Sequence, residues 1–168
     1  MERIRAVYRI IAAVVLVAGP AVPILADSGE SDERVAYPDG YREWTHVKSM
    51  VIEEGHSLYD TFGGIHHIYV NDEALAAMRE GNAFPEGAVL IFDLLEAQRK
   101  DDAIVEGPRK VLGVMEKDSD TFSETGGWGF QGFKGDSRER VVANPKQACF
   151  DCHTSRKESD YVFSTYRE

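Results

Sequence analysis

The sequence predicts an α+β fold, a mainly antiparallel β-sheet with one inserted helix and a C-terminal helical segment. Short runs of β-branched, aliphatic and aromatic residues recur along the chain, separated by glycine, proline or paired aspartates, which is typical of a sheet meander. Only residues 73–80, among the internal segments, have the spacing of an amphipathic helix. With 43% hydrophobic and 29% charged residues, this chain of 168 residues has a globular composition, and one domain is expected.

The predicted elements alternate with turns. Asn71 or Asp72 can cap the helix, which Gly81 would end. Asp101-Asp102 marks a loop, and residues 134–140 form a polar turn. Glycines in the last strand would allow close approach of a flat group or of another backbone. Strands are expected at residues 41–52, 65–70, 88–95, 109–116 and 127–133, and a short helix within 141–168.

The first 26 residues have the features of a secretory signal peptide. Three arginines precede an unbroken apolar run over residues 10–18, and Ala26 offers a cleavage site. The run is shorter than the ~20 residues of a membrane-spanning helix, which favours cleavage over an anchor. Residues 27–36 are charged and predict a disordered leader. Residues 37–168 would then form the folded domain of a protein exported to a bacterial periplasm.

The charge balance argues against a nucleic-acid partner. The chain has 29 Asp and Glu against 19 Lys and Arg, a net charge of −10, and phosphate binding needs the opposite sign. Solubility is a sufficient explanation for this acidity. Only two cysteines are present, which excludes a disulfide-rich scaffold.

The motif that carries chemistry is Cys149-Phe-Asp-Cys152-His153. Two thiols separated by two residues match the separation of the two vinyl groups of haem, and can form two thioether links. The imidazole that follows is then held against the iron as an axial ligand. The motif predicts one covalently attached haem c, bound through Cys149 and Cys152, with His153 as the metal ligand.

A C-x-x-C pair has other uses, namely a structural disulfide, a thioredoxin-like redox pair or half of a zinc site. A redox pair needs a βαβ context, and a zinc site needs a second pair of ligands; neither is visible in the sequence. Export of the chain, together with the restriction of its cysteines to this motif, favours haem attachment.

Further segments with a recognisable order and spacing accompany the haem motif at residues 149–153, namely residues 37–44, 68–69, 84–89, 126–130 and 157–164. In these segments the sequence resembles the cytochrome P460 family, a group of exported mono-haem c-type proteins. The resemblance implies a mainly antiparallel β fold, commonly a homodimer, and a five-coordinate haem with an open distal side. It implies oxidation of hydroxylamine with an external electron acceptor or, as in the related cytochrome c-prime-beta proteins, binding of nitric oxide without turnover.

One departure from the family concerns hydroxylamine oxidation. The family members with this activity carry a lysine that is cross-linked to the haem, and its position falls near Arg79-Glu80 in this chain. No lysine occurs between Lys48 and Lys100. An arginine cannot readily substitute, because its guanidinium stays protonated. The cross-link is therefore expected to be absent, although Lys48 could reach a haem from its own strand.

Further candidates surround this expected haem site. His66 and His67 are neighbours on a strand and face opposite sides, so one could act in the distal pocket while the other faces solvent. Arg79 is a third candidate for a distal role. Trp128 and Phe130 could wall the haem or belong to the sheet core, as could Phe133.

A plain electron carrier with both axial positions filled is the third functional class. Its sixth ligand would be one of three methionines, although a methionine more often fills a gap in a core. Asp93 and Glu96 could relay protons, but an acid at the end of a strand usually just reaches water. The three methionines are Met50, Met78 and Met115.

Overall fold

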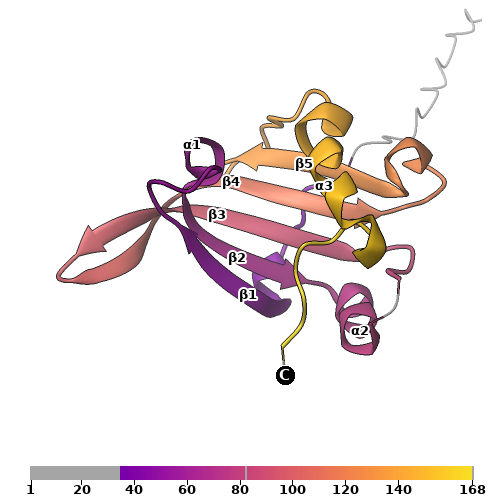
Figure 1. Cartoon of the computed structure of the whole chain (residues 1–168), viewed down its shortest axis with the longest axis horizontal. Coiled ribbons are helices and arrows are strands. Elements are labelled where there is room, and N and C mark those ends of the chain that lie inside the picture. The colour runs from indigo at the N-terminus through magenta and orange to yellow at the C-terminus, as the bar shows by residue number, and fades with distance from the viewer. Residues whose placement is uncertain (1–34, 82, 168) are drawn as a thin grey trace, which may run out of the picture. The chain divides into compact units, whose positions relative to one another are not determined.

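The computed structural model describes residues 35–81 and 83–167 (Figure 1). The signal peptide expected at residues 1–26 and all but the last two residues of the expected leader lie outside this part of the chain. No helix within the described residues is long and apolar enough to cross a membrane.

Five antiparallel strands form one sheet in the order of the sequence, which confirms the predicted meander. Each strand pairs with the next one along the chain, so β1 and β5 are the two edges. A bulge interrupts the pairing of β1 with β2 between His46 and Lys48. The strands are β1 (Thr45–Ile52), β2 (Gly64–Val70), β3 (Val89–Lys100), β4 (Ala103–Lys117) and β5 (Trp128–Lys134).

Three strands differ by several residues from their predicted bounds. β1 begins four residues later than expected, because Gly40 has a φ of 73° and starts a 3-10 turn, η1 (Tyr41–Glu43). β3 and β4 continue into a long hairpin that turns at Asp101 and Asp102, both with positive φ. Figure 1 shows this hairpin projecting beyond the other strands.

The inserted helix α2 (Asp72–Glu80) agrees with prediction. The Oδ1 atom of Asn71 accepts a hydrogen bond from the Ala74 amide at 3.1 Å, which caps the helix. Gly81 ends it in the left-handed conformation. Asn71 also accepts from the Val89 amide and donates to the Gly87 carbonyl, so it joins the helix to the start of β3.

Replacing Asn71 with alanine removes all three of these hydrogen bonds. We expect Asn71→Ala to lower the free energy of unfolding by about 2 kcal/mol, the upper end for loss of a helix cap. Urea unfolding followed by circular dichroism measures the loss. Asp72→Asn, at the first residue of the same helix, should cost less than about 1 kcal/mol, because only its interaction with the helix dipole changes. Equal losses in the two variants would contradict the capping role.

The two faces of the sheet bury separate cores. On one face Val70, Leu90, Met115 and Phe130 stand in register across four strands. The residues packed there form what we call the helix-side core, since α2 and the C-terminal segment cover it: Val70, Ala74, Leu75, Ala77, Phe84, Ala88, Leu90, Met115, Trp128, Phe130 and Val162. The far-side core consists of Val35, Tyr41, Ile91, Leu112, Val114 and Phe133.

Asp93 lies on the far side, where its side chain is fully buried. It accepts hydrogen bonds from the Tyr41 hydroxyl at 2.7 Å and from Nε of Arg109 at 2.6 Å, and Arg42 lies 3.2 Å away. The expectation that this carboxylate reaches water is therefore wrong. Burial and the neighbouring carboxylate raise the pKa of Tyr41, so the phenol stays protonated and donates. Glu96, by contrast, is exposed.

The C-terminal helical segment consists of three contiguous pieces. A π-helical turn, η3 (Lys146–Phe150), runs into α3 (Asp151–His153) and then into a 3-10 helix, η4 (Thr154–Ser159). Figure 1 shows this segment lying across the sheet, away from the projecting hairpin. The remaining short elements are α1 (Tyr59–Phe62), which precedes β2, and η2 (Ser123–Thr125), which precedes β5.

Candidate haem-attachment site

The C-terminal segment presents two unpaired thiols. Cys149 lies on the π-helical turn and is partly buried against the helix-side core, and Cys152 lies on α3 and is exposed. Burial raises the pKa of the Cys149 thiol, so it is protonated at neutral pH. The disulfide alternative is not realised in this structure, because both cysteines are free.

His153 follows directly on the same helix and has one ring nitrogen engaged. Its Nδ1 lies 2.7 Å from the carbonyl oxygen of Tyr161, so a proton on Nδ1 is donated to that carbonyl. The rings of Phe130 and Phe163 each stand 5.0 Å from the imidazole. Burial lowers the pKa of His153, which favours the neutral ring. With the proton on Nδ1, the lone pair of a neutral imidazole is on Nε2, as a metal ligand requires.

This donor set fits a covalently bound haem: two free thiols and an imidazole of fixed tautomer lie within five residues of one helix. The family model for cytochrome P460 matches residues 38–164, most of the chain. The chain belongs to the cytochrome P460 family. Membership of this family implies a c-type haem, and the two cysteines in the C-terminal helix are placed to hold one. No curated protein matches the chain.

The three aromatic residues considered for the haem wall occupy different positions in this P460 domain, and Phe133 lies in the far-side core. Phe130 contacts the rings of His153 and Phe150, so it lies beside the expected iron ligand. Trp128 is fully buried in the helix-side core, where its ring packs against Phe84 with the ring centres 5.4 Å apart. Its Nε1 donates to Asp160 at 3.3 Å. Phe130 is therefore the best placed of the three for contact with a haem.

His66 and His67 face opposite sides of the sheet, as the strand alternation requires. His66 is 1% exposed, its Nε2 bonds to the Phe62 carbonyl, and its Nδ1 has no partner. Burial lowers its pKa, which favours the neutral ring. His67 instead bonds to Ser49 at 2.6 Å and to Glu106 at 2.7 Å. Of the pair, His66 shares its sheet face with Val70 and the helix-side core.

Arg79, in the last turn of α2, is tied to the C-terminal tail. It donates to the Tyr166 hydroxyl at 3.3 Å, and its guanidinium lies 5.1 Å from the centre of that ring. Among the methionines, Met115 belongs to the helix-side core and Met78 packs against it, whereas Met50 is 40% exposed on β1.

The glycines of β5 make room for side chains from other parts of the same polypeptide. A Cβ on Gly129 would meet the Phe122 ring at 2.3 Å, and one on Gly132 would meet Val141 at 3.0 Å. The groups that approach these two glycines are side chains, one of them the flat Phe122 ring, and not another backbone.

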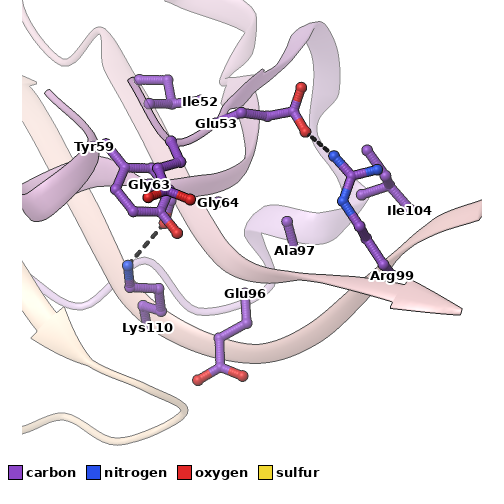
Figure 2. Close-up of a pocket in the computed structure, with 11 residues that line it drawn as sticks. Ile52, Glu53, Tyr59, Gly63, Gly64, Glu96, Ala97, Arg99, Ile104 and Lys110 are labelled. Carbon is purple, nitrogen blue, oxygen red and sulfur yellow. Dashed lines mark hydrogen bonds and ion pairs between the residues drawn. The ribbon is translucent and has the colours of Figure 1, made fainter. Parts of the chain in front are cut away.

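A pocket of about 560 Å³ lies at the other end of the sheet, between α1 and the β3–β4 hairpin (Figure 2). It is crossed by an ion pair between Glu53 and Arg99, and Lys110 donates to the Gly63 carbonyl at 2.7 Å. Of the residues singled out in the sequence, only Glu96 lines it. This pocket is separate from the C-terminal helix and its cysteines.

Sequence reasoning missed the residues that support His153. The partner of the imidazole is a backbone carbonyl, which has no side-chain signature, and it lies eight residues away. The segment carrying that carbonyl is held by Lys117 and Asp160, which are 43 residues apart in the chain. No local pattern could have paired them.

Proposed function

We propose that the protein is a periplasmic c-type cytochrome that binds a small nitrogen ligand, nitric oxide or hydroxylamine, at a haem iron with an open sixth position. Cys149 and Cys152 would hold the haem, and His153 would ligate the iron through Nε2. The haem, once attached, supplies a redox-active iron that coordinates such ligands. The apolar run of residues 10–18 ahead of the domain supports export.

The proposal of an open sixth position rests on where the other four histidines lie and what they bind. Each of them forms a hydrogen bond elsewhere: His46 with Ser49, His56 with the Leu58 amide, and the other two with the partners given above. These four histidines lie on β1, on β2 or between the two strands, and a histidine on another element than the C-terminal helix is poorly placed to close the sixth position, including His66, whose Nδ1 has no partner. His153 is the one histidine on the C-terminal helix.

We propose binding without sustained turnover of hydroxylamine. The resemblance links turnover to a lysine that this chain lacks between Lys48 and Lys100. The position expected for that lysine is next to Arg79, whose guanidinium is held against Tyr166. An arginine there supplies positive charge but no nucleophilic amine.

The test uses haem-loaded protein purified from a periplasmic fraction. We expect a high-spin absorption spectrum, a spectral shift on addition of nitric oxide, and no continuing reduction of a dye acceptor when hydroxylamine is added. The His153→Ala variant should lose the wild-type spectrum while retaining its thioether-bound haem. Sustained dye reduction by the intact protein would show instead that it is a hydroxylamine-oxidising enzyme with a redox partner.

An electron-transfer cytochrome is the second candidate, and one observation favours it. Met78 and Met115 lie in or against the same core as Cys149, so a thioether sulfur could fill the sixth position. A low-spin spectrum that becomes high-spin in Met115→Leu or Met78→Leu would establish this function. The homodimer implied by the family stays a prediction, which sedimentation analysis of the haem-loaded protein would test.

A further inference from the structure

The backbone turn that faces His153, the proposed proximal ligand, has a strained conformation. Asp160 and Tyr161 are consecutive residues with φ of 49° and 65°, a region that residues other than glycine rarely adopt. The Tyr161 carbonyl is the group that bonds to Nδ1 of His153. Such strained backbone persists only where the surroundings hold it in place, and it concentrates at functional sites.

A nearly buried ion pair holds this turn. The Asp160 carboxylate lies 3.0 and 3.1 Å from the Lys117 ammonium, and their side chains are 17% and 10% exposed. The same carboxylate accepts hydrogen bonds from Nε1 of Trp128 at 3.3 Å and from the Phe84 amide at 3.0 Å. Lys117 ends β4, Trp128 begins β5 and Phe84 precedes β3, so the turn is tied to three parts of the sheet.

Lys117 is itself fixed by further contacts. Its ammonium donates to the Gly126 carbonyl at 3.2 Å and lies 4.9 Å from the centre of the Trp128 ring. Gly126 also makes room for the turn, because a Cβ there would meet the Tyr161 ring at 2.4 Å. The Tyr161 ring and the Asp160 carboxylate thus both pack against the end of the sheet where β4 is joined to β5.

We propose that Lys117 and Asp160 are positioning residues for the proximal iron ligand, acting through the Tyr161 carbonyl. They hold that carbonyl where it accepts the Nδ1 proton of His153, which orients the ring and raises the electron donation of Nε2 to the iron. A hydrogen bond on the far nitrogen of a ligating histidine has this general effect on ligand basicity. The proposal rests on the assignment of His153 as the iron ligand made above.

Asp160→Asn and Lys117→Met test the proposal. Asparagine tolerates the left-handed conformation and keeps the shape of aspartate, so this change removes the charge and leaves the turn accessible. In haem-loaded protein we expect both variants to retain one haem per chain. Both should show a lower iron–histidine stretching frequency in resonance Raman spectra of the reduced form, and a more positive reduction potential. A weaker hydrogen bond at Nδ1 makes the imidazole a poorer donor, which favours the reduced iron.

Asp39→Asn is the matched control. It breaks an aspartate–arginine pair of 2.6 Å with Arg138 that is exposed and contacts neither the turn nor the helix, so both spectroscopic values should stay at those of the wild type. Should Asp160→Asn fail to fold, Lys117→Met carries the test from the other side of the pair.

Two outcomes separate the possible failures. An iron–histidine band in the wild type that neither variant shifts, at an unchanged potential, overturns the positioning role alone. Loss of stability in the variants without those shifts counts as the same result, since it shows a purely structural pair. Retention of the wild-type spectrum in His153→Ala overturns the ligand assignment and the positioning role with it.

Discussion

Replacement of both Cys149 and Cys152 with serine is expected to abolish covalent haem attachment completely. These are the only cysteines in the chain, and both thiols are free in the folded domain. Serine cannot form a thioether, so haem should be removed entirely by acid–acetone extraction after denaturation. Intact-mass analysis of periplasmic protein should show the bare polypeptide for the double variant and the polypeptide plus one haem for the wild type.

Ser155→Ala is the control for this loss. Its hydroxyl donates to the Cys152 carbonyl at 2.9 Å on the same helix, so the variant perturbs the helix without removing a thiol. It should keep its covalent haem. If the double variant retained haem that survives denaturation, attachment through these two thiols would be wrong.

Among the substitutions considered for stability, loss of Arg109, which pairs with Asp93, should have the largest effect. Arg109→Met leaves the carboxylate with the Tyr41 hydroxyl and with Arg42, whose side chain is 47% exposed. Removing one partner of a buried ion pair costs about 3–5 kcal/mol, because the remaining buried charge loses its best-shielded partner. We expect a decrease of that size in the free energy of unfolding, measured by urea unfolding at pH 7.

Arg99→Met provides the comparison, because Arg99 pairs with Glu53 on the surface, where the two side chains are 75% and 56% exposed. Its cost should not exceed about 1 kcal/mol. Combining Asp93→Leu with Arg109→Met should restore much of the stability, because no charge is then left buried. If Arg109→Met and Arg99→Met lowered the free energy of unfolding by similar amounts, burial of Asp93 would not explain the cost of losing its partner.

The sheet order and the inserted helix could be predicted because both depend on local patterns. Alternating apolar runs and an Asn cap followed by a C-terminal glycine are visible within single segments. The hairpin extension of β3 and β4 could not be predicted this way. Its residues are mostly exposed on both faces, so hydrophobic alternation stops, and Pro108 suggests a break. That proline lies where the strand register shifts, and such irregularities tolerate it.

The haem motif could be predicted from the sequence, but the residues that position His153 could not. Cys149, Cys152 and His153 lie within five residues of one another, and their spacing predicts a haem ligand set. Lys117, Asp160 and the Tyr161 carbonyl meet only after β4, β5 and the C-terminal tail have packed together. Asp93 shows the same limit, since its partners Tyr41 and Arg109 come from segments far away in the chain.

The irregularity in β1 also bears on how the protein behaves at high concentration. An open strand edge can recruit the same edge of other molecules and so seed fibrillar aggregates. The opposite edge is shielded at Phe133, which bridges to Arg140. On β1 the bulge between His46 and Lys48 breaks the row of amides and carbonyls that an incoming strand would need. The bulge therefore limits the regular part of this edge to the residues that follow it, among which Met50 and Val51 are exposed to solvent.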